Sequence, residues 1–185
     1  MKTFKKVMLL TLTSLMALSL TACQAFIPAL IANNAASKAA SSMSEKTEFL
    51  IGDTVTLNDW DITVHSIEFV DSIPNGELLQ FTPGEGNKYA LLHMTIKNVG
   101  TAVNTFSPTI SFGKNGVMLI YDGQYEYAAS RLLGHSDDLH DKSCNPLVEA
   151  SGFIAFSVVN EVAKTDKPLV ARIADSNNTY TVKLR

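Results

Sequence analysis

The sequence predicts an all-β domain, a β-sandwich of about seven to nine strands, behind an N-terminal signal peptide and tether. From Phe49 to Arg185, apolar and polar residues alternate with a period of two, and no sustained helical spacing appears. Turn-forming pairs, Asn115-Gly116 and Asp122-Gly123, separate neighbouring runs. The strand number and domain length match an immunoglobulin-like sandwich. We therefore divide the chain into a signal peptide (1–22), a tether (23–48) and a sandwich domain (49–185).

The first 22 residues have the layout of a secretory signal peptide. The basic segment Met1–Lys6 precedes the apolar run Val7–Leu20, which is too short to span a membrane comfortably. The run leads into Leu20-Thr21-Ala22-Cys23, which resembles the bacterial lipobox, where cleavage leaves an acylated cysteine as the first residue. We expect Cys23 to carry diacylglycerol, with acyl chains such as palmitate, and we expect no other cofactor. The alternative is an ordinary signal peptide with a chance cysteine.

Residues 23–48 are expected to form a tether. They are rich in Ala, Ser and Asn and show no strand-like alternation. As a flexible coil they would reach about 25 to 30 Å, enough to lift a small domain off the lipid. The prediction is a lipoprotein anchored on the extracytoplasmic face of the cell membrane. A tail packed on the domain is the alternative.

Charge and cysteine content exclude several classes of protein. Lys2, Lys5 and Lys6 are three of the 15 basic residues, so the chain after residue 22 has 12 basic and 18 acidic residues, a net charge of −6. Such a body does not attract nucleic acid phosphates, and no nucleic-acid partner is expected. With Cys23 lipidated, Cys144 has no disulfide partner and is expected to be a free thiol, packed in the fold or lying in a loop.

The first long runs predict strands with one irregularity. Phe49–Leu57 and Trp60–Phe69 alternate, but the phase of the second run slips near His65-Ser66, which predicts a β-bulge. In Tyr89–Asn98, one face is apolar, so His93 is expected to point outward. The outward position of His65 and His93 favours ordinary surface residues.

The later runs predict a meander and a central strand. Ile110–Phe112, Val117–Tyr121 and Tyr125–Ala129 are joined by the two Gly-containing turns. Phe153–Val159 is apolar on both faces, as a central strand would be. The last strand alternates around Tyr180, Val182 and Leu184. The long connections, 71–87 and 130–151, are either recognition loops or contain short elements that the pattern does not reveal.

Several motifs together resemble a known family. They follow the lipobox and tether, and they are Ile51-Gly52-Asp53-Thr54-Val55-Thr56-Leu57-Asn58-Asp59-Trp60, Gly86-Asn87-Lys88-Tyr89, Thr95-Ile96-Lys97-Asn98-Val99-Gly100 and Glu149-Ala150-Ser151-Gly152-Phe153-Ile154-Ala155-Phe156. The chain resembles the Ig-like domain of unknown function of Gram-positive surface lipoproteins, similar in fold to a secreted mycobacterial immunoprotective antigen. The resemblance implies an architecture but no catalytic residues. One departure is Val148-Glu149-Ala150-Ser151, where the family usually has a Pro-Gly turn.

One segment could carry chemistry. Gly134–Asp141 holds two of the four histidines and three aspartates, and imidazole with carboxylate suits zinc or a related divalent ion. The candidate metal ligands are His135, Asp137 and His140. Their spacing matches no recognised metal motif, and a solvated loop with aspartate turns is the alternative.

Tyr121, Tyr125 and Tyr127 are candidate partner-binding residues, because exposed aromatic side chains make good contact surfaces. Cross-strand aromatic pairing is the alternative. The chain shows no Gly-x-Ser-x-Gly elbow, phosphate-binding glycine loop, His-Glu-x-x-His motif or paired carboxylates, so no enzyme is predicted.

Two functions therefore remain. The first is a non-catalytic, lipid-anchored module that binds an extracellular protein or a cell-wall glycan. The second is a lipoprotein that binds a small ligand or divalent metal through the 135–141 loop.

Overall fold

A computed structural model describes residues 47–108 and 116–185, which belong to one compact unit, Glu45–Arg185. The predicted signal peptide, the lipidated Cys23 and nearly all of the predicted tether lie outside the described residues, as does the predicted strand Ile110–Phe112. Among the described residues, no helix has the length and apolarity needed to cross a membrane.

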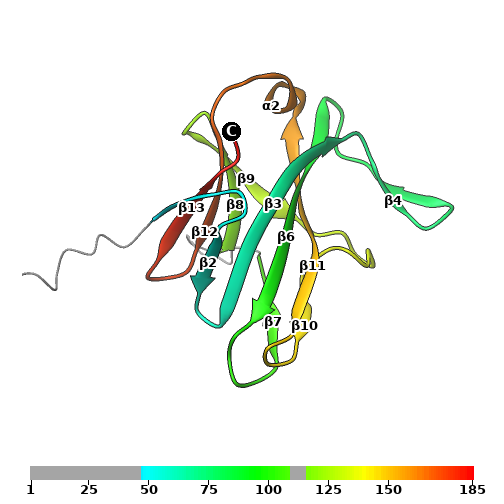
Figure 1. Ribbon diagram of the computed structural model, residues 1–185. Helices are drawn as coiled ribbons and strands as arrows, with labels where there is room; N and C mark the ends of the chain where they lie inside the picture. Colours follow the sequence, from blue (N-terminus) through cyan, green and yellow to red (C-terminus); the bar gives the residue numbers. More distant parts are fainter. Residues whose placement is uncertain (1–46, 109–115) are drawn as a thin grey trace, which may run out of the picture. The chain divides into compact units, whose positions relative to one another are not determined.

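Within the described ranges, nine strands form one hydrogen-bonded sheet in the order β1-β13-β12-β8-β9-β11-β6-β3-β2 (Figure 1). These strands are β1 (Glu48–Leu50), β2 (Thr54–Leu57), β3 (Trp60–Val70), β6 (Asn87–Asn98), β8 (Gly116–Tyr121), β9 (Tyr125–Ser130), β11 (Glu149–Val159), β12 (Leu169–Ala174) and β13 (Thr179–Lys183). Four short strands of the described ranges form two separate pairs: β4 (Ile73–Asn75) with β5 (Leu79–Phe81), and β7 (Asn104–Phe106) with β10 (Lys142–Cys144). One short helix, α2 (Asn160–Lys164), follows β11.

The sheet folds over itself into two layers. Strand β9 makes this possible, because it pairs with β8 along most of its length and then with β11 at Ala129 and Ser130. The main core lies between the layers and takes residues from both, including Ile62 and Phe156 from one and Leu119 and Leu169 from the other. The predicted all-β sandwich is therefore confirmed.

The predicted number of strands is too low. The described residues contain thirteen strands, and the additional strands are mostly three residues long. A run of three residues is too short to establish a period of two, so the sequence pattern could not reveal these strands.

The predicted β-bulge is confirmed at His65. Val64 pairs with Met94 and Ser66 pairs with His93, so His65 is the extra residue of β3. The bulge restores the inward phase of the strand: Val64 is fully buried before it, and Ile67 packs against the same core after it.

The predicted Asp122-Gly123 turn is also confirmed. Both residues have positive φ, 51° and 69°, as the tight turn between β8 and β9 requires. Aspartate and glycine adopt a positive φ at a lower steric cost than most other residue types.

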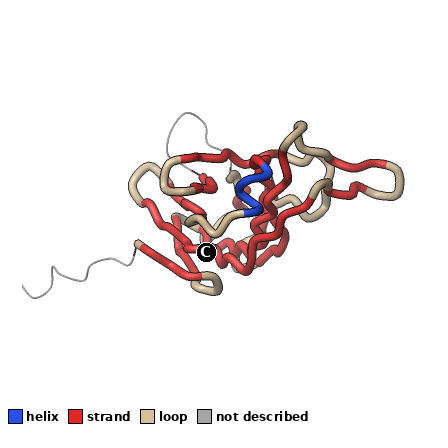
Figure 2. The backbone as a smooth tube through the Cα atoms, turned by 90° about the horizontal axis from the view of Figure 1, so that it is seen from above, coloured by secondary structure: helices blue, strands red, loops and turns tan. Residues whose placement is uncertain are grey.

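Strands β6 and β11 are buried on both faces over a stretch of four residues each, 89–92 and 153–156. Their outer side chains form a second apolar cluster, which the connections between strands cover. The β4–β5 hairpin, which extends from the sandwich in Figure 2, contributes Ile73 to this cluster. The segment after β9 contributes Leu132. The two long connections of the sequence are thus partly structured, and they carry the candidate site.

Candidate functional site

The segment between β9 and β10 pairs with the edge of β11 through an isolated parallel bridge between Asp138 and Phe153. The amide of Phe153 donates to the carbonyl of Asp137 at 2.9 Å, and the amide of Leu139 donates to the carbonyl of Phe153 at 3.1 Å. This approach requires glycine at position 152, since a Cβ there would lie 2.3 Å from the Asp137 carbonyl oxygen. The glycine therefore fixes where the 135–141 loop sits.

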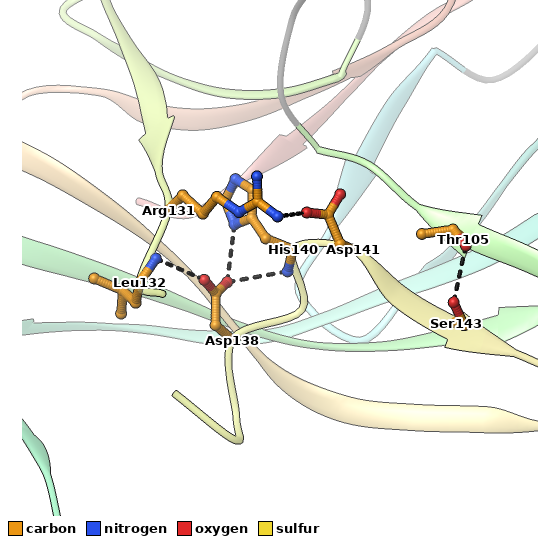
Figure 3. Close-up of polar contacts among 7 residues, drawn as sticks. All are labelled: Thr105, Arg131, Leu132, Asp138, His140, Asp141 and Ser143. Atoms are coloured by element: carbon orange, nitrogen blue, oxygen red, sulfur yellow. Dashed lines mark hydrogen bonds and ion pairs between the residues drawn. The ribbon is translucent and has the colours of Figure 1, made fainter. Parts of the chain in front are cut away.

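Asp138 is the centre of this loop (Figure 3). Its carboxylate accepts hydrogen bonds from the amide of Leu132 at 2.8 Å and the amide of His140 at 3.0 Å, and it bonds Nδ1 of His140 at 2.8 Å. The side chains of Asp138 and His140 are both buried, only 4% and 3% exposed. Arg131 and Asp141 form an ion pair beside them. The Asp138 carboxylate thus connects the two sides of the loop, at Leu132 and at His140.

The hydrogen bonds around Asp138 also control its ionisation. Burial raises the pKa of this carboxyl group, but the bonds from the His140 side chain and from the amides of His140 and Leu132 outweigh burial. The pKa therefore lies below the ordinary value of 3.8. Asp138 is ionised at neutral pH and acts as a fixed acceptor.

The opposite ring nitrogen of His140, Nε2, is buried and has no hydrogen-bond partner among the described residues. Asp138 orients the ring through Nδ1. His140 is thus a structural member of the loop, enclosed by the fold.

His135 connects the loop to the β4–β5 hairpin. Its Nε2 lies 3.1 Å from the carbonyl oxygen of Pro74, and its Nδ1 accepts from the amide of Asp137 at 3.2 Å. The ring also packs against Phe81 and Phe153, with centroids 6.3 and 5.2 Å away. Both ring nitrogens of His135 are therefore occupied by protein contacts.

The predicted metal ligands do not converge. No group of three or more His, Cys, Asp or Glu in residues 47–108 and 116–185 is arranged to hold a metal ion. His135 holds the hairpin, His140 is enclosed with Asp138, and Asp137 accepts from Ser136 at 3.0 Å. The metal-binding alternative stays a prediction, for which metal analysis of the purified protein is the test.

A different pocket is lined by His65 and His93, which the sequence pattern predicts to be ordinary surface residues. It has a volume of about 380 Å³ and opens on the outer face of β3, β6 and β11. We call it the histidine pocket, and its lining residues are His65, His93, Met94, Asp137, Ser151, Gly152 and Phe153. It was missed because its residues come from four separate segments, although the outward phase of His65, His93 and Ser151 was a usable signal.

Hydrogen bonds and ring contacts order the walls of the histidine pocket. Nε2 of His65 lies 2.8 Å from Oγ1 of Thr95, which lies 2.8 Å from Oγ of Ser151. Nε2 of His93 lies 3.3 Å from the Glu68 carboxylate, and its ring meets Phe153 edge-on at 5.8 Å. His93 points outward as predicted, with its side chain 34% exposed.

The three predicted partner-binding tyrosines have different environments. Tyr121 is buried, and its hydroxyl bonds Glu161 and Thr165. Tyr127 is half-buried against the main core, and Tyr125 alone of the three is exposed, at 52%. Tyr121 and Tyr125 pair across β8 and β9 with ring centroids 6.0 Å apart. Cross-strand packing accounts for most of this cluster.

Cys144, the candidate free thiol, is buried in the main core and forms no disulfide with any residue that the structure describes. Its burial fits a packing role rather than that of an accessible nucleophile.

The two-layered sheet and its covering loops define a β-sandwich domain. Residues 49–170 match the model of a family described as a domain of unknown function, DUF4352. Because this match covers more than half of the chain, the protein belongs to that family. No curated protein matches the chain.

Several solved bacterial structures are similar in fold. An uncharacterised β-sandwich protein from Clostridium difficile 630 has 19% identity and a TM-score of 0.55, over 76% of this chain and 95% of the other. A conserved hypothetical protein from Bacillus anthracis has 12% identity and a TM-score of 0.50, over 74% and 95%. The yjhA protein from Bacillus subtilis has 16% identity and a TM-score of 0.50, over 74% and 99%. These similarities establish the fold alone.

Proposed function

We propose that this protein is a membrane-anchored extracytoplasmic lipoprotein that presents its Ig-like domain as a non-catalytic interaction module. The observation that carries the proposal is the sequence Leu20-Thr21-Ala22-Cys23 at the end of a basic and then apolar leader. Two acyl chains on Cys23 make a stable anchor, because each buried CH₂ contributes about 0.8 kcal/mol. In this proposal the chain is one of the Gram-positive surface lipoproteins that it resembles, with a fold like that of the mycobacterial antigen.

The placement of the candidate catalytic groups supports a binding role. His140 is enclosed with Asp138, His135 has both ring nitrogens occupied, and the Cys144 thiol is buried. A general base or nucleophile must reach its substrate. These three groups are instead used to hold the loop, the hairpin and the core.

The β4–β5 hairpin is the surface that we propose for a protein partner. It extends away from the sandwich (Figures 1 and 2) and carries Leu78 and Leu79, which are 94% and 69% exposed. Burying such side chains in a partner contributes roughly 1.5 to 3 kcal/mol each. The base of the hairpin is fixed by Ile73 in the second apolar cluster and by the His135 contact to Pro74. The leucines are thus presented on an anchored support.

Replacing Cys23 by alanine is expected to move the protein from the membrane fraction to the soluble fraction and to abolish its labelling by a palmitate analogue. The expected loss is complete, since Cys23 is the proposed acyl acceptor. Fractionation and labelling of intact cells measure both effects. The matched control is Cys144→Ala, which removes the other cysteine and should keep both the label and the membrane location. Membrane retention of the Cys23→Ala protein would contradict the proposal.

Replacing Leu78 and Leu79 together by serine is expected to remove the partner captured by crosslinking on intact cells, because the exposed apolar contact is lost. The melting temperature should stay within about 2 °C of wild type, since exposed substitutions change stability by about 0.5 kcal/mol or less. Mass spectrometry of the crosslinked material identifies the partner. Exposed Leu133 on a neighbouring loop, replaced by serine, serves as a control. Equal capture by the double variant and wild type would exclude the hairpin as the contact surface.

A further inference from the structure

We infer that the histidine pocket binds a saccharide, with Asp137, His65, His93 and Ser151 contacting its hydroxyl groups. This inference goes beyond the proposed anchoring and hairpin contact, and it rests on the proposed location outside the membrane, where glycans are accessible. The pocket has the size of a small-ligand site, which ranges from about 300 to 1,000 Å³.

Two special backbone features, the β-bulge at His65 and Gly152 of β11, lie at the histidine pocket. The β-bulge at His65 places an extra residue of β3 opposite β6, next to His93. Gly152 on β11 lets the loop approach closely enough to bring Asp137 to the pocket. A β-bulge often redirects a side chain next to a functional site. A glycine inside a strand often marks a place where a ligand or another backbone comes close.

The residues that line the histidine pocket keep unused hydrogen-bonding capacity. Nδ1 of His65, Nδ1 of His93 and Oδ2 of Asp137 form no hydrogen bond with the described residues. Oγ of Ser151 bonds Thr95 and keeps further hydrogen-bonding capacity. Thr95 and Glu68 hold the two imidazoles through their Nε2 atoms, so the orientation of each ring is fixed before a ligand arrives.

The lining of the histidine pocket suits a neutral polar ligand better than an anion or a metal ion. Anions are disfavoured because two carboxylates would repel them: Asp137 lines the pocket, and Glu68 contacts Nε2 of His93. A metal ion is disfavoured because His65, His93 and Asp137 do not form a ligand group. Sugar hydroxyls each donate one hydrogen bond and accept others, which suits a wall of imidazole, carboxylate and hydroxyl groups. A neutral saccharide is the class that uses all of them.

The test uses the full-length chain in detergent micelles, with its histidines labelled with carbon-13. Because the chain has four histidines, each ring gives an assignable signal. The probes are glucose, N-acetylglucosamine and soluble fragments of peptidoglycan. We expect saturable shifts of the His65 and His93 signals with at least one probe, and an unchanged signal from His140, whose ring is enclosed with Asp138.

The matched variants are Asp137→Asn and Asp166→Asn. Asp137 lines the pocket, and its carboxylate bonds only Ser136 among the described residues, so its replacement should leave the fold intact. Asp166 is an exposed carboxylate outside the pocket. We expect Asp137→Asn to weaken saccharide binding about tenfold, as loss of a charged hydrogen bond does, and Asp166→Asn to bind like wild type.

No shift of the His65 and His93 signals with any of the three probes would overturn the inference. Equal binding by the Asp137→Asn and wild-type proteins would also overturn it. Neither result touches the anchor, which the Cys23→Ala fractionation tests separately. A partner captured through the hairpin, with no saccharide shift, would leave the proposed function standing and remove this inference.

Discussion

Replacing Asp138 by alanine is expected to lower the free energy of unfolding by about 3 to 5 kcal/mol, the loss typical of a broken buried pair. The substitution leaves the amides of Leu132 and His140 and the Nδ1 of His140 without their acceptor in a buried site. Urea-induced unfolding measures the change. A small domain has about 5 to 15 kcal/mol of stability in total, so the effect is large.

The neighbouring carboxylate supplies the matched control. Asp137 is exposed, and its side chain bonds only Ser136 among the described residues, so Asp137→Ala should change stability by about 0.5 kcal/mol or less. Asp138→Asn keeps an acceptor oxygen but loses the charge, and it should fall between the two. Equal stabilities of the Asp137→Ala and Asp138→Ala proteins would show that Asp138 does not organise the loop.

The same carboxylate makes a pH-dependent contribution. The pKa of Asp138 is lower in the folded protein than its ordinary value of 3.8, so its ionised form stabilises the fold. That contribution is fully present above the unfolded pKa and is lost as the pH falls through the folded pKa. The stability difference between wild type and Asp138→Asn should therefore be constant near neutral pH and shrink below about pH 4. A difference that grows toward acid would contradict this assignment.

The second large effect is expected from Gly152→Ala. The new Cβ would lie 2.3 Å from the Asp137 carbonyl oxygen and 3.1 Å from the Leu139 side chain. Since the first contact is with backbone, the loop must move away from β11 and break the hydrogen bonds at Phe153. We expect a loss of about 2 to 3 kcal/mol, in the range of an overpacked core, and faster hydrogen exchange at the Phe153 amide.

Gly84→Ala is the control for this substitution. Its Cβ would meet only the Asn87 side chain, at an ordinary contact distance of 3.6 Å, and its φ is not positive. This variant should keep wild-type stability within about 0.5 kcal/mol. Wild-type exchange at the Phe153 amide in the Gly152→Ala protein would mean that the loop does not depend on its close approach to β11.

The sandwich was predictable because its long strands carry their own pattern. The phase change at His65-Ser66 revealed a bulge, and Asp122-Gly123 revealed a hairpin turn, since both signals are local. The β4–β5 hairpin was not predictable in the same way. Its strands are three residues long, and Leu78 and Leu79 at its tip are exposed rather than alternating.

The candidate site was predicted in part, because its groups meet only in three dimensions. The 135–141 segment was recognisable as unusual, but its spacing gave no indication that Asp138 would hold His140 and that His135 would hold the hairpin. The histidine pocket depends on pairing between strands distant in sequence, such as His93 with Phe153. Local periodicity places a side chain on a face but does not say which neighbours share that face.

Anchoring of this domain to a membrane through Cys23 can be read from the intact mass of the protein purified from membranes. We expect a chain that begins at Cys23 and carries the added mass of diacylglycerol, with fragmentation placing that mass on the first residue. A mature chain that begins elsewhere, or that begins at Cys23 without lipid, would contradict this anchoring.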